Sequence, residues 1–224
     1  MTDAPFRPFE TNLDEAAALA TLRAATAGAD DGELFLERRR SEAIVLDDGR
    51  IKTASYDASE GFGLRAVNGE VAGYAHSTEI SEAALKRASE TARLAVGSGG
   101  GKMAAAPART NTKLYGDADP MADASFAVKI DLLREIDAYA RALDPRVVQV
   151  SATIAAGLQE VEILRPEGLR YSDVRPMARM NVSVIIQDKG RREQGGTGGG
   201  GRHGLAGLLA PSNWQPLLKE ALAR

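Results

Sequence analysis

The sequence contains no cysteine among its 224 residues. This absence excludes disulfide bonds, thiolate ligands for a metal and a cysteine nucleophile. It is typical of a protein from a reducing compartment, and we predict a cytoplasmic location. The N-terminus lacks a basic segment followed by an apolar run, so no secretion signal is expected. No apolar segment has the length that a bilayer-spanning helix needs.

Histidine is also scarce, with only His76 and His203. They lie far apart in the sequence and neither belongs to a two-histidine helical spacing, so a metal site would need both of them and a carboxylate. A histidine that faces solvent or makes ordinary hydrogen bonds is the commoner interpretation, and no cofactor is expected in this chain. The net charge of −3 provides no field that attracts nucleic acid or an anionic membrane, and neither is an expected partner.

Helical and β-rich segments alternate along the chain. Apolar residues recur at helical spacing in residues 12–27, 81–96, 125–143 and 214–224. Thr11 and Asp14 form the pattern of a capping box ahead of the first of these helices. The β-rich segments are residues 33–38, 42–47, 50–56, 61–67, 71–75, 147–155, 160–165, 169–173 and 180–187.

Glycines mark the expected turns between these strands. Asp48-Gly49 and Asn68-Gly69 predict tight hairpins, because a type I′ turn needs two positive φ angles. Gly168 and Gly190 mirror them in the second half, which suggests an internal repeat; chance agreement between two β meanders is the alternative. We predict an α+β fold of two similar lobes, each a mostly antiparallel sheet with helices packed on one face. The expected organisation is an N-terminal helical segment (1–30), a first lobe (31–97), a linker rich in Gly, Ala and Pro (98–124), a second lobe (125–212) and the start of a further helix (213–224).

The least ordinary segment is residues 190–204, Gly-Arg-Arg-Glu-Gln-Gly-Gly-Thr-Gly-Gly-Gly-Gly-Arg-His-Gly. Residues 196–201 formally satisfy G-x-G-x-x-G, but polar residues precede them and no second buried strand follows, so a nucleotide site is a weak interpretation. Local chemistry leaves two others open: a mobile surface loop, or a glycine-rich edge strand that accepts an extended peptide. Arg191, Arg192 and Arg202 could contact carbonyls or carboxylates.

The order of several motifs resembles the N-terminal domain of the TldD/PmbA family. These motifs lie at residues 44–52, 61–70, 73–75, 173–176, 181–187 and 190–202. The resemblance is closer to the TldD branch, because the run Arg-Glu-x-Gly-x-x-Gly-Gly-Gly-Gly-Arg at 192–202 looks like its signature. It covers nearly the whole chain from about Asp31 onward.

The resemblance implies a zinc metallopeptidase, also described as a modulator of DNA gyrase, that degrades unfolded or leader peptides. A TldE/PmbA-like subunit or a second copy is the implied partner. The family's metal site is an H-E-x-x-x-H helix plus a later cysteine in a C-terminal β-rich domain. This sequence contains neither, so zinc is expected only in the full-length parent, and this chain alone is not expected to cleave peptides. Residues 222–224 fall inside the helix that leads toward the catalytic domain in the family, which suggests a fragment or a truncated gene product.

The resemblance also favours the edge-strand interpretation, because the family's N-terminal domain helps enclose the catalytic chamber around an extended peptide. The expected substrate-binding residues are Gly198, Gly199, Gly200, Gly201 and Arg202, and no catalytic or metal-ligating residue is expected. The expected function is substrate enclosure and subunit pairing in a TldD-like metallopeptidase. The alternative is a stand-alone module that binds peptides or a partner. Arg65 is expected to pair with a carboxylate across the sheet, which is a structural role.

Overall fold

The computed structural model describes residues 4–97 and 115–224. These residues form a six-stranded antiparallel sheet with the strand order β3-β2-β1-β4-β5-β6. The strands are β1 (Asp31–Asp47), β2 (Arg50–Asn68), β3 (Val71–Ser77), β4 (Val147–Leu164), β5 (Arg170–Asp188) and β6 (Arg191–Gly201). The helices are α1 (Pro8–Thr11), α2 (Glu15–Ala25), α3 (Glu82–Val96), α4 (Phe126–Leu143), α5 (Ala206–Leu209) and α6 (Pro211–Ala223). The predicted α+β class is confirmed.

Strands β1, β2 and β4 are each longer than the sequence predicts. Residues 33–38 and 42–47 join into β1, residues 50–56 and 61–67 into β2, and residues 147–155 and 160–165 into β4. The joining residues of β1 and β2 are polar or small, so the alternation of apolar side chains fades there, whereas in β4 it continues through Ala156 and Leu158. The backbone hydrogen bonds of a sheet do not depend on side-chain polarity, so the strands continue.

The described residues divide into two compact units. Unit 1 contains residues 4–39, 59–97 and 159–174, and unit 2 contains residues 40–58, 115–158 and 175–224. Strands β1, β2, β4 and β5 contribute to both units, so the units interleave along the chain. The consecutive domain boundaries expected from the sequence stay a prediction. Residues 98–114 of the expected linker lie outside the described residues.

In unit 1, the apolar faces of helices α2 and α3 and of strands β1 and β2 pack into one buried cluster. The cluster includes Leu22, Leu34, Leu36, Leu64, Leu85 and Ala92, each no more than 1% exposed. Helix α2 begins after Asp14, whose side chain accepts the backbone N–H of Ala17. The expected capping box with Thr11 is therefore wrong. Thr11 is the last residue of α1, and its hydroxyl donates a hydrogen bond to the carbonyl of Arg7.

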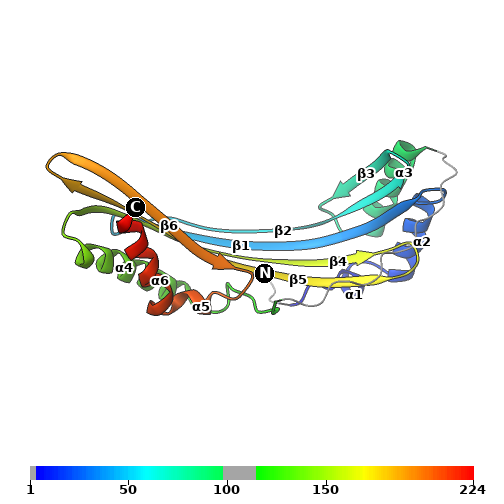
Figure 1. Cartoon of the computed structure of the whole chain (residues 1–224). Helices are drawn as coiled ribbons and strands as arrows, with labels where there is room; N and C mark the ends of the chain where they lie inside the picture. Colours follow the sequence, from blue (N-terminus) through cyan, green and yellow to red (C-terminus); the bar gives the residue numbers. More distant parts are fainter. Residues whose placement is uncertain (1–3, 98–114) are drawn as a thin grey trace. The chain divides into compact units, whose positions relative to one another are not determined.

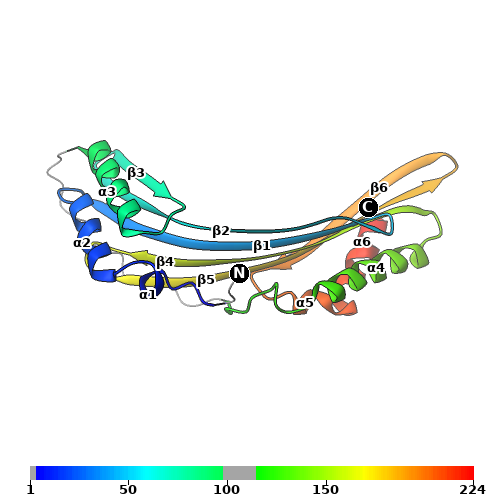
Figure 2. The same ribbon diagram turned by 180° about the vertical axis from the view of Figure 1, so that it is seen from behind.

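In unit 2, helices α4, α5 and α6 lie on the same side of the strands in both views (Figures 1 and 2). Trp214 of α6 is 1% exposed and meets the ring of Tyr139 of α4 edge-on, with ring centres 5.3 Å apart. Val150, Ile154, Met180 and other alternate residues of β4 and β5 complete this core. The other face of these strands bears no helix among the described residues.

The predicted hairpins are present. Asp48 and Gly49 have φ angles of 49° and 76°, the two positive values that the β1–β2 turn requires. The β2–β3 turn has a single positive φ, 59° at Gly69. Among the described residues, no helix combines the length and apolar character needed to cross a membrane.

Candidate functional site

The glycine-rich segment forms β6, the terminal strand at one edge of the sheet. Lys189 and Gly190 have φ angles of 49° and 84°, which close a two-residue turn from β5. Strand β6 then runs antiparallel to β5 until Gly201 lies opposite Ala178. In the described part of the chain, no strand pairs with the other side of β6. The segment is therefore an edge strand and not a loop, and its antiparallel course excludes the parallel strand that a nucleotide-binding glycine motif needs.

Helix α6 covers one face of β6 at very close range. A Cβ atom at Gly195 would overlap the backbone carbonyl oxygen of Ala221, well inside the 3.0 Å that Cβ atoms keep from other heavy atoms. Gly199 lies on the same face, four residues on, and its Cβ would be at an ordinary 3.6 Å from a δ-carbon of Leu217. Part of the glycine content of β6 therefore allows α6 to approach the strand.

The outer edge of β6 exposes the backbone groups of alternate residues. Arg224 donates a hydrogen bond of 3.1 Å from Nη1 to the carbonyl oxygen of Gly196, so this carbonyl faces away from β5. The N–H and C=O groups of an antiparallel strand point to alternate sides, and those of Gly198 and Gly200 therefore face the same way as those of Gly196. Gly196, Gly198 and Gly200 therefore line the outer edge, and the carbonyl of Gly196 already accepts a hydrogen bond from Arg224.

The contacts of Gly198 and Gly200 with β5 leave no space for a side chain. A Cβ atom at Gly198 would lie 2.8 Å from the carbonyl oxygen of Met180 and would overlap the side-chain oxygen of Asn181. Gly200 has a φ of 158°, and a Cβ atom there would overlap the carbonyl oxygen of Ala178. Larger residues would push β6 away from β5, so these glycines also maintain the pairing of the two strands.

Arg202 follows the end of β6 and has a partner within the chain. Its guanidinium carbon lies 5.5 Å from the centre of the Tyr115 ring, within the range of a cation–π contact. Nearby, Asp123 accepts the backbone N–H of Ala206 at 3.1 Å. The segment before α4 is thus held beside the end of β6. A contact of Arg202 with substrate remains a proposal.

The sequence did not predict a shallow hollow on the helix-free face of unit 2. It measures about 330 Å³, and its lining includes Asp47, Gln149, Ser183 and Gln194 from four strands. Gln149 donates a 2.9 Å hydrogen bond to Asp47, and this bond lowers the pKa of the carboxyl group, with a further contribution from Lys52 at 3.1 Å. Because Gln194 belongs to β6, the hollow adjoins the glycine-rich strand. Polar residues at alternate positions, Gln149 and Ser151 of β4 and Asn181 and Ser183 of β5, were the signal in the sequence.

The described residues offer no arrangement for a metal ion. Across residues 4–97 and 115–224, no group of three or more His, Asp or Glu side chains could hold one. The Nδ1 atom of His203 lies 2.7 Å from the carbonyl oxygen of Gly204, while His76 stacks on Tyr74. These two histidines, without a third ligand beside either of them among the described residues, do not form a zinc site.

The expected pairing of Arg65 with a carboxylate is confirmed. Its Nη2 atom lies 2.9 Å from Asp31 of β1, and its Nε atom lies 3.6 Å from Glu33. Arg165, which follows β4, contacts the same two carboxylates at 2.5 Å and 3.6 Å. Two arginines and two acids thus lie close enough to neutralise one another, and the structural role of Arg65 stays a prediction.

Comparison with known proteins identifies the family. The model for PmbA/TldA metallopeptidase domain 1 matches residues 32–96, and the model for the PmbA/TldA metallopeptidase central domain matches residues 119–224. The chain therefore belongs to the PmbA/TldD metallopeptidase family.

Within this family, the curated relatives similar to this chain include TldD homologs. The metalloprotease TldD homolog of Haemophilus influenzae is 34% identical over 180 residues, and that of Buchnera aphidicola subsp. Acyrthosiphon pisum is 33% identical over 174 residues. The alignments cover 79% and 77% of this chain but only 37% and 36% of the relatives. The matched region thus spans little more than a third of their length.

Solved structures share the fold. A putative modulator of a DNA gyrase from Thermotoga maritima has a TM-score of 0.72 and 15% identity, over 94% of this chain and 46% of that one. A putative modulator of DNA gyrase from Bacteroides thetaiotaomicron has a TM-score of 0.69 and 15% identity, over 93% and 49%. TldE from Thermococcus kodakarensis has a TM-score of 0.68 and 16% identity, over 92% and 46%.

Proposed function

We propose that this chain is the substrate-enclosing and subunit-pairing region of a TldD-like metallopeptidase that hydrolyses unfolded or leader peptides. In this proposal the zinc ion and the hydrolytic step belong to another part of the full-length protein; among the described residues, no group of three or more His, Asp or Glu side chains could hold a metal ion. The proposed partner is a TldE/PmbA-like subunit or a second copy, and the proposed location is the cytoplasm. The likeness to a TldE structure supports a pairing of this type.

The outer edge of β6 is the observation that carries the proposal. An extended peptide that pairs with this edge hydrogen-bonds to the backbone groups of Gly198 and Gly200. Backbone pairing does not depend on the peptide's side chains, which suits a substrate class defined by its unfolded state. The absence of side chains on these residues removes a steric barrier to the approaching strand.

The other predicted site residues have supporting roles in this proposal. A Cβ atom at Gly199 would face Leu217 of α6 and one at Gly201 would face His203, so in this proposal both residues support β6 and do not pair with the peptide. Arg202 stands at the end of the strand, where its guanidinium group can contact a peptide carbonyl or carboxylate. These residues bind and orient the peptide, and none of them takes part in bond cleavage.

Hydrogen exchange during peptide binding tests the proposal on the intact chain. The probe is a fluorescein-labelled, unstructured peptide of about ten residues, a length that exceeds a typical strand. Binding should slow exchange at the backbone N–H groups of Gly198 and Gly200, which face outward, and leave that of Gly199 unchanged. A peptide that fails to bind, or that binds without protecting β6, contradicts the proposal.

A double variant provides the functional arm. Gly199→Val with Gly200→Val should reduce turnover of unfolded peptides by the full-length enzyme pair, whereas Gly199→Ala should not. Because a side chain at Gly200 overlaps β5, circular dichroism must show that the double variant is folded. Unchanged turnover by a folded double variant counts against the role of β6.

A further inference from the structure

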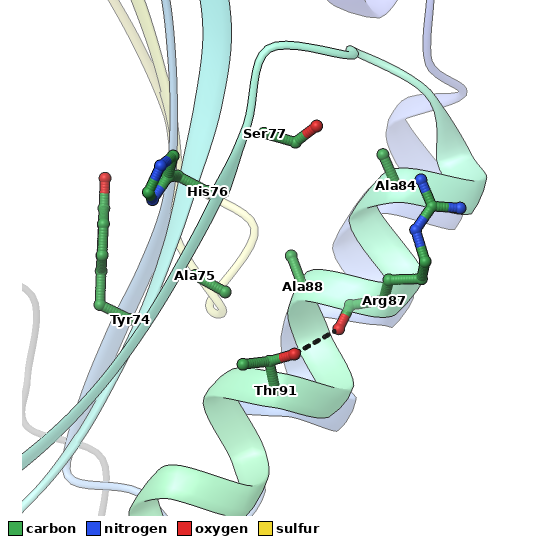
Figure 3. A pocket seen from close by; sticks show the side chains of 8 residues that line it. All are labelled: Tyr74, Ala75, His76, Ser77, Ala84, Arg87, Ala88 and Thr91. Atoms are coloured by element: carbon green, nitrogen blue, oxygen red, sulfur yellow. Dashed lines mark hydrogen bonds between the residues drawn. The ribbon is translucent and has the colours of Figure 1, made fainter.

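Strand β3 forms the opposite edge of the sheet and has a hollow beside it (Figure 3). It pairs with β2 on one side, with Gly63 opposite His76, and in the described part of the chain it has no strand on the other. The hollow measures about 390 Å³ and is lined by β3 and α3 alone, within unit 1. Because β2 contributes nothing to the lining, the hollow opens along the unpaired edge of β3. We call this feature the β3–α3 groove.

The groove is wedge-shaped, with α3 very close to β3 at one end (Figure 3). At Gly73 the two elements are in contact, since a Cβ atom there would overlap the backbone carbonyl oxygen of Ala92. Toward the N-terminus of α3 the facing side chains are small: the methyl groups of Ala75, Ala84 and Ala88 and the hydroxymethyl group of Ser77. A small aliphatic side chain from a strand docked at this edge fits between them.

An exposed aromatic pair lies on the face of β3 turned away from α3 (Figure 3). The rings of Tyr74 and His76 are stacked, with centres 5.7 Å apart and planes 29° apart. Tyr74 lies across Gly63, where a Cβ atom would come within 2.6 Å of the phenolic oxygen, yet its side chain is 60% exposed. Val71 on the same strand is 51% exposed. Exposed apolar groups gathered along one strand edge are typical of a binding surface.

The charges of the groove favour an acidic ligand. Its lining contains Arg87 but no carboxylate. Arg87 pairs with Glu79 at 3.3 Å, but both side chains are more than 60% exposed, so solvent weakens this pair. A carboxylate held inside the groove gains from closer contact with Arg87.

We propose that the β3–α3 groove binds an extended acidic peptide by strand addition to β3. Successive side chains of a strand point to opposite faces. One position of the peptide therefore faces α3, and the next faces Tyr74 on the other side of β3. A small aliphatic residue enters the wedge between Ala84 and Ala88, and the adjacent aromatic residue stacks on Tyr74. An acidic residue pairs with Arg87. This site is separate from β6 and does not rest on the proposed peptidase function.

The probe is a fluorescein-labelled peptide of seven residues, the length of β3, with the sequence Thr-Tyr-Val-Tyr-Val-Glu-Thr and blocked termini. Fluorescence anisotropy with the intact chain measures its affinity. Arg87→Glu should weaken binding by about tenfold, because it places like charges together. Lys86→Glu is the matched control: it makes the same charge change on the neighbouring residue of α3, which does not line the groove.

The aromatic contact has its own matched pair. Tyr74→Ser should weaken binding by about fivefold, the effect of losing one aromatic contact. Tyr56→Ser, which removes a 50% exposed tyrosine of β2 away from the groove, should leave affinity unchanged. A probe with Gln in place of Glu should bind wild type and Arg87→Glu equally.

Backbone methylation tests strand addition itself. Two versions of the probe carry N-methyl groups at the odd or at the even positions. Only alternate N–H groups of a docked strand face β3, so one version should retain binding and the other should lose it. Equal binding of both versions, equal effects of Arg87→Glu and Lys86→Glu, or no binding overturns the proposal. Self-association of the wild type that Tyr74→Ser abolishes also overturns it, in favour of a second copy as the occupant.

Discussion

A methyl group at Gly195 has no space between β6 and α6. The atom that it would overlap is the backbone carbonyl oxygen of Ala221, in the last turns of α6, so no side-chain rotation can relieve the contact. Either α6 or β6 must move away. Because Trp214 and Leu218 of the same helix are at most 1% exposed, such a movement also loosens the core of unit 2.

We expect Gly195→Ala to destabilise the chain by about 3 kcal/mol, the upper end of the usual cost of overpacking. For a protein of this size, that corresponds to a fall in Tm of roughly 6 to 12 °C. Trp214 is the only tryptophan of the chain and lies on α6, so its fluorescence reports the release of this helix directly. Thermal unfolding followed by fluorescence and by circular dichroism is the measurement.

Gly199→Ala is the control for this prediction. It adds the same methyl group to the same face of β6, but at 3.6 Å from Leu217, an ordinary contact. Its effect should stay within about 0.5 kcal/mol. If the two variants unfold at the same temperature, the close approach of α6 does not explain Gly195, and the reasoning is refuted.

Two further predictions concern charged groups of unit 2. The hydrogen bonds from Arg146 lower the pKa of Asp144 from 3.8 to about 2, so its stabilising effect is present above the unfolded pKa and is lost as the pH falls through about 2. Asp144→Asn should therefore be less stable than wild type near neutral pH, and urea titrations at decreasing pH should show this difference vanish near pH 2; a constant difference contradicts the assignment. Lys129 is 1% exposed and its Nζ atom lies 2.6 Å from Glu42, so Lys129→Met should cost about 3 kcal/mol by leaving a carboxylate unpaired. Adding Glu42→Gln should recover part of that loss in urea unfolding, and no recovery would show that the pair is not the cause.

The local features of this protein could be predicted from its sequence. The turn at Asp48 and Gly49 has the two positive φ angles that the dipeptide predicts. The helical spacing between residues 125 and 143 corresponds to α4 within one residue. These features depend on neighbouring residues only, so a single sequence contains the information. The order of the motifs was also sufficient to indicate the family.

The full lengths of β1 and β2 could not be predicted, because pairing with adjacent strands extends them through segments of polar and small residues. The predicted capping box of α2 was also wrong, because the hydroxyl of Thr11 is hydrogen-bonded to the carbonyl of Arg7 in the preceding turn. Both differences arise from interactions that compete with the local pattern.

The sequence alone determined that residues 190–201 are rich in glycine, and it left a mobile loop and an edge strand open. Only the tertiary structure decided between them, by pairing β6 with β5 and leaving its other edge unpaired among the described residues. It also gave Gly195 a packing role beside Ala221 and placed a groove between β3 and α3. The sequence shows that a glycine allows another segment to come close. Which segment does so depends on how distant parts of the chain fold together, and only the tertiary structure contains that information.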